Sequence, residues 1–262
     1  MIYSTSMFMN ELELLDLKIK EESPHVDKIF IVESELTFTG NPKSVAFPKG
    51  KYDSYGNVEH VLLDKTMFDN DTDAWVRQER QRNAITDLVS YSDDDVWIVM
   101  DLDEIIPGEY IPILVEETRK RGALRMGMQL YYYYINTQFT SDVEWHPIMT
   151  TGVAVREHTL DYLRDCVFFG HRVGNCGKHF SYLSNPEGIS LKLKSFAHTE
   201  LGGPEFTDVE RIKNHMDQLS DICGRGKKLE VVEIDSSYPK TILNNLAEWE
   251  QYIYAGQASE VK

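Results

Sequence analysis

The pattern with the clearest chemistry in this sequence is a pair of aspartates, Asp101 and Asp103, separated by one leucine. The pair follows residues 96–100, an apolar run typical of a buried strand. Ligands of open α/β sheets bind beyond the carboxyl ends of strands, so this position favours a ligand site. Two carboxylates so close repel each other, and a divalent cation turns that repulsion into attraction. We therefore predict a site for Mn²⁺ or Mg²⁺, ions often shared between one or two carboxylates and a diphosphate; the alternative is that the acids only cap the strand.

The elements that must hold this pair alternate between strand and helix over the first 120 residues. Strand patterns cover residues 2–9, 28–33, 58–63 and 96–100. Helix patterns cover an apolar stripe that begins near Leu12, behind an expected capping box of Asn10 and Glu13, and residues 73–90 and 110–121. This alternation implies a mostly parallel sheet flanked by helices.

The second half of the chain is richer in β patterns. These extend from residue 123 to about 155, and residues 168–182 look irregular because they mix glycine, histidine and aromatic residues. Two further helices are expected at residues 207–222 and 239–254. We therefore predict a single α/β domain over residues 1–262, with halves that meet between residues 122 and 123.

The predicted helix over residues 73–90 carries polar side chains on an otherwise apolar face. Trp75, Gln78 and Arg82 recur at steps of three and four residues, so they share one side of the helix. The planar guanidinium of Arg82 suits a diphosphate, since it binds two oxygens at once. The alternative is that Arg82 pairs with a nearby aspartate and only holds the helix in place.

The net negative charge of the protein limits the kinds of macromolecule that it is expected to bind. The 262 residues carry 43 Asp and Glu against 27 Lys and Arg, a net charge of −16. Such acidity argues against nucleic acid or an anionic membrane as the main partner. No apolar run reaches the roughly 18–20 residues of a membrane span, and the first residues do not resemble a signal peptide. We therefore expect a cytoplasmic protein without a membrane span.

Three ordered blocks resemble glycosyltransferase family 17, the family of β-1,4-mannosyl-glycoprotein β-1,4-N-acetylglucosaminyltransferases. The first comprises residues 10–17, 26–34 and 37–42, the second residues 94–107 around the aspartate pair, and the third begins at His179 and continues through residues 186–189, 192–193 and 195–198. The blocks follow the family order over most of the chain, which is more specific than any single motif. The chain differs in having Lys178 where a tryptophan usually precedes the family's histidine.

The resemblance implies a GT-A-like fold, UDP-GlcNAc as donor, a carbohydrate acceptor, a divalent metal and inversion at the anomeric carbon. By motif, Asp101 and Asp103 become the metal and diphosphate residues. Glu11, Glu33 and Arg82 become candidates for the nucleotide-sugar pocket, and His179 for its closing side. Residues 1–122 would bind the nucleotide-sugar, and residues 123–262 would form the acceptor side.

The reaction also needs a base that deprotonates the acceptor hydroxyl. We place catalysis at Asp103 and Glu104, and Glu144 and Asp142 remain further candidates for the base. Two other functions stay open: a non-catalytic carbohydrate- or nucleotide-sugar-binding protein on the same fold, and a phosphatase that uses the aspartate pair. The phosphatase is less favoured, because its motif would follow an early strand and continue with threonine or valine, whereas Ile105 stands here.

Overall fold

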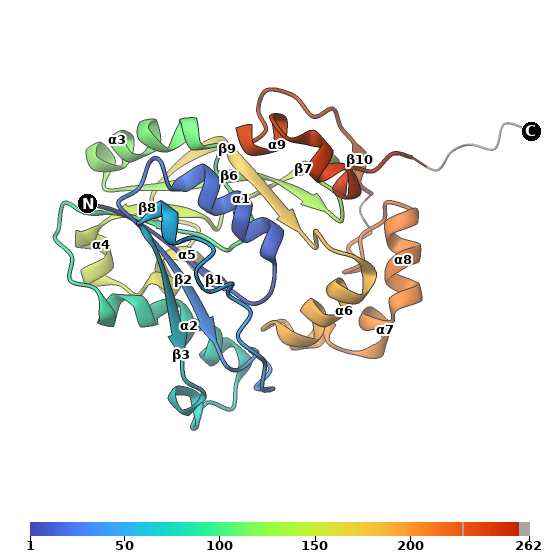
Figure 1. The fold of residues 1–262 in the computed structure, drawn as a ribbon, viewed down its shortest axis with the longest axis horizontal. Helices are drawn as coiled ribbons and strands as arrows, with labels where there is room; N and C mark the ends of the chain where they lie inside the picture. Colours follow the sequence, from blue (N-terminus) through green and yellow to red (C-terminus); the bar gives the residue numbers. More distant parts are fainter. Residues whose placement is uncertain (227, 257–262) are drawn as a thin grey trace, which may run out of the picture.

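The computed structural model describes residues 1–226 and 228–256 (Figure 1). Residue 227 and residues 257–262, the end of the predicted domain, lie outside the described residues. The first half of the chain forms parallel strands in the order β3, β2, β1, β4, and the carboxyl ends of these strands therefore meet at one edge. Their bounds are close to the predicted ones: β1 Ile2–Phe8, β2 Lys28–Ser34, β3 Val58–Leu63 and β4 Val96–Val99.

The apolar runs of these strands are explained by burial on both faces. In β2, Ile29 and Ile31 pack into one core, and Phe30 and Val32 pack into another on the opposite face. The first core is completed by helices α1 (Leu12–Glu22) and α3 (Ile111–Arg121). The second is completed by helices α2 (Ala74–Leu88), α4 (Gly152–Glu157) and α5 (Leu160–Asp165). The predicted α/β domain with a parallel sheet between helices is confirmed.

The sheet continues without a break into the second half. Strand β8 (Ile148–Thr151) pairs antiparallel with β4 and β6 (Ala123–Tyr132), and β7 (Thr137–Glu144) pairs with β6 and with β10 (Glu230–Val231). The prediction that residues 168–182 are irregular is wrong, because the long strand β9 (His171–Ser181) forms there. Strand β9 pairs parallel with β6 and antiparallel with the short β5 (Glu104–Ile105), directly after the aspartate pair.

A helical cluster beside the strand ends was not fully predicted. Helices α6 (Pro186–Ser195), α7 (Pro204–Thr207) and α8 (Val209–Asp217) lie together on one side of the molecule and share a third core with β6 (Figure 1). The predicted helix 207–222 corresponds to the shorter α8. The predicted helix 239–254 divides into α9 (Lys240–Leu243) and a 3-10 helix, η5 (Leu246–Tyr252).

The predicted capping box at α1 is wrong. Residue Glu11 is the N-cap, and it makes no side-chain capping bond. Its carboxylate turns back and accepts the backbone N–H groups of Met9 and Asn10, at 3.3 and 3.1 Å. By contrast, Asp73 caps α2 as expected for an acid at a helix start, because its carboxylate accepts the N–H of Trp75 at 2.7 Å.

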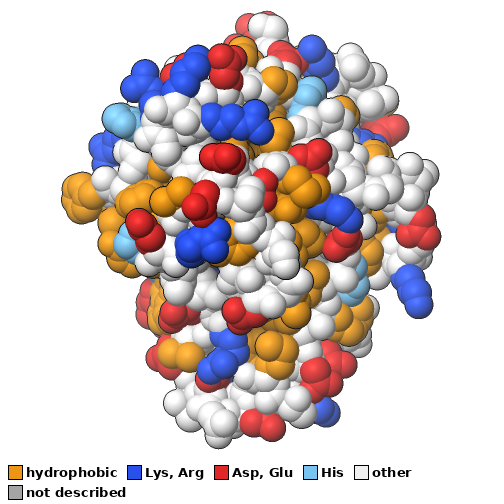
Figure 2. Space-filling model, turned by 90° about the vertical axis from the view of Figure 1, so that its left-hand side faces the viewer, with side chains coloured by type: hydrophobic (Ala, Val, Ile, Leu, Met, Phe, Trp, Pro, Cys, Tyr) orange, Lys and Arg blue, Asp and Glu red, His pale blue; other side chains and the backbone are white. Residues whose placement is uncertain are grey.

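The surface mixes charges of both signs. Figure 2 shows Lys and Arg side chains interspersed with Asp and Glu on one face of the molecule. Within residues 1–226 and 228–256, every helix is too short or too polar to cross a bilayer.

Candidate functional site

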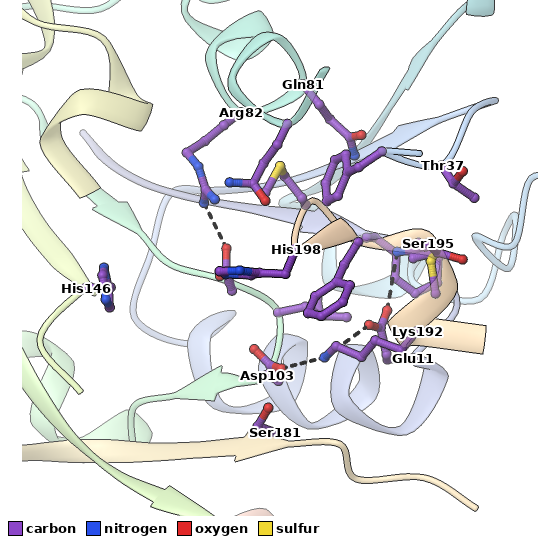
Figure 3. Close-up of a pocket in the computed structure, with 18 of the residues that line it drawn as sticks. Glu11, Thr37, Gln81, Arg82, Asp103, His146, Ser181, Lys192, Ser195 and His198 are labelled. Atoms are coloured by element: carbon purple, nitrogen blue, oxygen red, sulfur yellow. Dashed lines mark hydrogen bonds and ion pairs between the residues drawn. The ribbon is translucent and has the colours of Figure 1, made fainter. Parts of the chain in front are cut away.

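A cavity of about 610 Å³ opens where the parallel strands end. Its lining includes Phe8 at the end of β1 and Met9 directly after it, Thr37 after β2, and both Asp101 and Asp103 after β4. Side chains from helices α2 and α6 complete the wall (Figure 3). The structure therefore brings the two aspartates together at the strand-end position that ligands use in open α/β sheets.

Two buried arginines hold the first aspartate. Asp101 accepts a hydrogen bond from Arg82 Nη1 at 2.8 Å through Oδ1, and from Arg164 Nη2 through Oδ2. Burial opposes the charge on Asp101, but Arg164 and then Arg82 outweigh it and hold its pKa below the usual range. Arg82 also donates from Nε to Asp161 Oδ1 at 2.8 Å. Arg82 therefore lines the cavity and also makes the structural pair that was its alternative role.

A lysine and a histidine hold the second aspartate. Lys192 Nζ lies 2.7 Å from Asp103 Oδ2 (Figure 3). His179 Nε2 lies 3.4 Å from Asp103 Oδ1. Burial works against ionisation of Asp103, but Lys192 and His179 keep its pKa well below the usual range. Burial lowers the pKa of His179, and Asp103, with weaker help from Glu104 and Glu144, outweighs that effect and raises it to about 9. This raised pKa favours the protonated imidazolium of His179 at neutral pH.

The predicted catalytic residue Glu104 does not line the cavity. Its side chain is 1% exposed, accepts the backbone N–H of Asp101 at 2.7 Å, and lies 2.9 Å from Arg164 Nη2. These contacts fix the turn that carries the aspartate pair. Glu104 is placed to position Asp101 and Arg164 rather than to touch a ligand in the cavity.

The two predicted glutamates of the nucleotide-sugar pocket lie in different places. Glu11 lines the cavity, with Oε1 3.7 Å from Lys192 Nζ. Glu33 is fully buried behind it and holds the loop after β2: its carboxylate accepts the N–H groups of Ala46 at 2.7 Å and Phe47 at 3.1 Å, and it pairs with Lys43. Glu33 shapes the pocket through this loop and does not line the cavity.

Aromatic side chains contribute to the lining of the cavity. Trp75 and Gln78, on the predicted face of α2, line the cavity together with Phe38 and Phe196. The ring of Trp75 meets His198 edge-on, with centroids 4.6 Å apart. Such rings offer flat apolar faces for a base or a sugar. Of the tyrosines in residues 131–134, Tyr132 lines the cavity.

Several lining residues were not assigned a role from the sequence. Arg164 lies on α5 and carries no recognisable motif, and Lys192 belongs to a family-like block but was given no function. On the far side of the cavity, Glu144 and His146 lie with Oε2 and Nε2 3.9 Å apart. Of the three predicted bases Glu104, Glu144 and Asp142, only Glu144 lines the cavity.

The donor atoms at Asp101 and Asp103 fit one kind of metal site. Within the described residues, no group of three or more His, Cys, Asp or Glu side chains is placed to hold a metal ion alone. The aspartates offer hard carboxylate oxygens at the cavity wall, which suit Mg²⁺ or Mn²⁺ bound through one or two carboxylates and the phosphates of a ligand. The residues therefore fit a metal shared with a ligand, and not one caged by the protein.

Comparison with solved structures finds distant similarity. The structure of S. aureus TarS residues 1–349 aligns with a TM-score of 0.40 and 11% identity, over 82% of this chain and 71% of that one. The galactosyltransferase LgtC, in complex with donor and acceptor sugar analogs, aligns with a TM-score of 0.34 and 10% identity, over 76% and 80% of the two chains.

Comparison with known sequences identifies the family. Similar proteins include the beta-1,4-mannosyl-glycoprotein 4-beta-N-acetylglucosaminyltransferases of Rattus norvegicus and Homo sapiens, each 24% identical. The alignments cover 94% of this chain and 52% of the rat protein, and 77% and 44% for the human one. The chain thus spans about half the length of the curated relatives it matches. The model of glycosyltransferase family 17 matches residues 1–227, which confirms the predicted resemblance. The chain therefore belongs to glycosyltransferase family 17.

Proposed function

We propose that this protein transfers GlcNAc from UDP-GlcNAc to a hydroxyl group of a carbohydrate, with inversion at the anomeric carbon. The observation that carries the proposal is the convergence of Asp101 and Asp103 on a cavity of about 610 Å³ at the carboxyl ends of the parallel strands. Family membership and the acetylglucosaminyltransferase names of the relatives support the reaction and the donor sugar.

The proposed donor site lies between the ends of β1, β2 and β4. The diphosphate would lie near Asp103, within reach of Lys192 and His179, whose positive charges suit phosphate oxygens. The base and ribose would extend toward Thr37 and the aromatic ring of Trp75. Asp101 and Asp103 are the proposed ligands of Mn²⁺ or Mg²⁺, and such an ion would neutralise the charge that develops on the departing UDP.

Glu144 is the proposed general base. Inversion requires the acceptor oxygen to attack the anomeric carbon from the side opposite the diphosphate, while the bond from that carbon to the phosphate oxygen breaks and UDP leaves with the electron pair. The proton of the acceptor hydroxyl passes to the base. Glu144 lines the cavity, its side chain is 27% exposed, and it lies on the side of the cavity that His146 lines. An acceptor reaching the cavity from that side would meet its carboxylate.

A thermal-shift screen of nucleotide sugars tests the donor assignment. The full chain is heated with UDP-GlcNAc, UDP-glucose or GDP-mannose, each with Mn²⁺ and again with a chelator in excess. We expect UDP-GlcNAc to raise the melting temperature, GDP-mannose to leave it unchanged, and the chelator to reduce the shift. The absence of a shift with every uridine nucleotide would contradict the proposal. Binding of UDP-GlcNAc without transfer to any acceptor would favour a carbohydrate- or nucleotide-sugar-binding protein.

A further inference from the structure

Lys192 contacts two acidic side chains of the cavity through a single ammonium group. It extends from α6, and its Nζ lies 2.7 Å from Asp103 Oδ2 and 3.7 Å from Glu11 Oε1 (Figure 3). Its side chain is 22% exposed, so the ammonium borders the space that a ligand would fill. Lys192 is therefore at the centre of the proposed donor site, although the proposed reaction gives it no obligatory step.

Every carboxylate oxygen of the aspartate pair already has a cationic partner in the protein. Asp101 binds Arg82 through Oδ1 and Arg164 through Oδ2, and Asp103 binds His179 and Lys192 in the same way. When no nucleotide-sugar donor is bound, protein cations already balance the negative charge of these oxygens. These positive charges repel an arriving metal ion, so metal binding at the pair becomes stronger when one of the cations moves away.

Lys192 is the cation that is freest to move. Arg82 is 4% exposed and Arg164 is 7% exposed, and each makes a second close ion pair, with Asp161 at 2.8 Å and with Glu104 at 2.9 Å, whereas the second carboxylate near Lys192, that of Glu11, is 3.7 Å away. His179 is 18% exposed and its ring is carried by strand β9. Lys192 is more exposed than either arginine, and its ammonium sits at the end of a flexible four-carbon stem with three rotatable N–H donors. An arriving diphosphate offers stronger negative charge within a small displacement of that ammonium.

We propose that Lys192 makes metal binding at Asp103 conditional on the nucleotide-sugar donor. In the donor-free protein the Lys192 ammonium is paired with Asp103 Oδ2. When the donor binds, the ammonium turns to the diphosphate, and Asp103 Oδ2 becomes available to Mn²⁺ or Mg²⁺. The inference rests on the proposed function, because it assumes that a nucleoside diphosphate binds in this cavity. It implies that the ion and the donor bind together, and that neither the ion alone nor the protein alone completes the site.

Titration with Mn²⁺, followed by the electron paramagnetic resonance signal of free Mn²⁺, tests this coupling without measuring catalysis. The full chain is titrated with and without saturating UDP, as the wild type and as Lys192→Met, Lys192→Arg and Lys194→Met. Lys194 is an exposed lysine on the same helix, which makes Lys194→Met the matched control. Circular dichroism and thermal unfolding establish that each variant is folded.

The proposal predicts four results. UDP tightens Mn²⁺ binding to the wild type by at least about tenfold, and Lys194→Met behaves like the wild type. Lys192→Met binds Mn²⁺ without UDP at least about tenfold more tightly than the wild type does, since its Asp103 lacks the competing charge. In Lys192→Met, UDP still tightens Mn²⁺ binding through its phosphates, but by a smaller factor than in the wild type. Lys192→Arg keeps the charge and retains a dependence on UDP.

Two outcomes would overturn the proposal. One is equal Mn²⁺ affinity of the wild type with and without UDP, a comparison that needs no variant. The other is a Lys192→Met variant that is folded and binds Mn²⁺ as the wild type does, which would make Lys192 a structural salt-bridge partner only. Failure of UDP to bind under any condition, seen directly by calorimetry, would instead overturn the proposed function on which the inference rests.

Discussion

Arg82 Nη1 donates a hydrogen bond of 2.8 Å to Asp101 Oδ1, and this bond ties the middle of α2 to the end of β4. The same guanidinium reaches Asp161 on α5 through Nε, so three elements meet at one side chain. The first carboxylate of the pair is thus fixed before any ligand arrives. This preorganisation is the physical basis on which the proposed donor site depends.

Removing Arg82 is therefore expected to affect both stability and donor binding. Arg82→Met leaves Asp101 and Asp161 without this partner, and we expect the free energy of unfolding to fall by about 2 kcal/mol. This loss is smaller than the roughly 3–5 kcal/mol expected when a fully buried ion pair is broken, because the Asp101 side chain is partly exposed. Urea denaturation measures the loss. Arg121→Met, which breaks an exposed pair with Glu117 on α3, should change stability by less than about 1 kcal/mol. Equal effects of the two variants would contradict this role of Arg82.

The proposed base makes a kinetic prediction. Glu144→Gln keeps the shape of the side chain but cannot accept the acceptor's proton, so we expect kcat to fall by about 100-fold or more with little change in KM for UDP-GlcNAc. Release of UDP in the presence of a working acceptor measures the rate. Glu116→Gln, at an exposed position on α3, is the control and should retain full activity. Unchanged kcat in Glu144→Gln would assign the base elsewhere.

Substitution of the buried Glu33 distinguishes a structural role of this residue from a role in ligand binding. Its carboxylate accepts two backbone N–H groups and pairs with Lys43 and His60, and although burial opposes its charge, these partners lower its pKa. Glu33→Gln should therefore cost about 1–3 kcal/mol of unfolding free energy at pH 7. The difference from the wild type should shrink below pH 4.5, because stability that depends on a lowered carboxyl pKa is lost as that carboxylate is protonated. A variant with wild-type stability and abolished UDP binding would show instead that Glu33 acts on the ligand.

The buried Lys178 gives a prediction about how stability depends on pH. Lys178 is 2% exposed, its Nζ donates to Gln129 Oε1 and Ser237 Oγ at 3.1 Å each, and it lies 3.9 Å from the ring centre of Tyr238. Burial lowers its pKa to about 8, against a weaker opposing effect of Asp235. The unfolded chain therefore binds more protons than the folded protein between about pH 8 and 10.5, so this lysine makes stability rise with pH over that window.

Denaturation of the wild type and of Lys178→Met across pH 7–10.5 measures this contribution. We expect the stability of the wild type, relative to Lys178→Met, to increase by up to about 3 kcal/mol as pH rises through the window. A pH-independent difference between the two proteins would contradict the shifted pKa.

The sequence predicted the parallel half of the fold because its signals are local. Alternate residues of β2 and β4 enter two different cores, so their apolar runs mark buried strands directly. The face of α2 was predicted from helical spacing, and Trp75, Gln78 and Arg82 indeed line the cavity. The position of the aspartate pair followed from the strand that precedes it.

Strand β9 was missed because its glycines look like loop residues. A Cβ atom on Gly177 would lie 2.2 Å from the carbonyl oxygen of Ile105, so glycine is required there for β9 to approach β5. The contact of Lys192 with Asp103 joins residues 89 positions apart, and it depends on how α6 packs against the strand ends. No pattern within either segment reveals that approach. That Glu104 does not line the cavity also depends on contacts between distant segments, such as its pairing with Arg164, and so could not be predicted from the sequence.

The central claim is transfer of GlcNAc through a site built on the aspartate pair. Its most direct test is the product formed from UDP-GlcNAc, Mn²⁺ and a panel of oligosaccharide acceptors, characterised by NMR for the wild type and for Asp103→Asn. We predict a new β-linked GlcNAc formed in equal amount with UDP, and a loss of about 100-fold or more in Asp103→Asn. An α-linked product, or an Asp103→Asn variant as active as the wild type, would contradict the account.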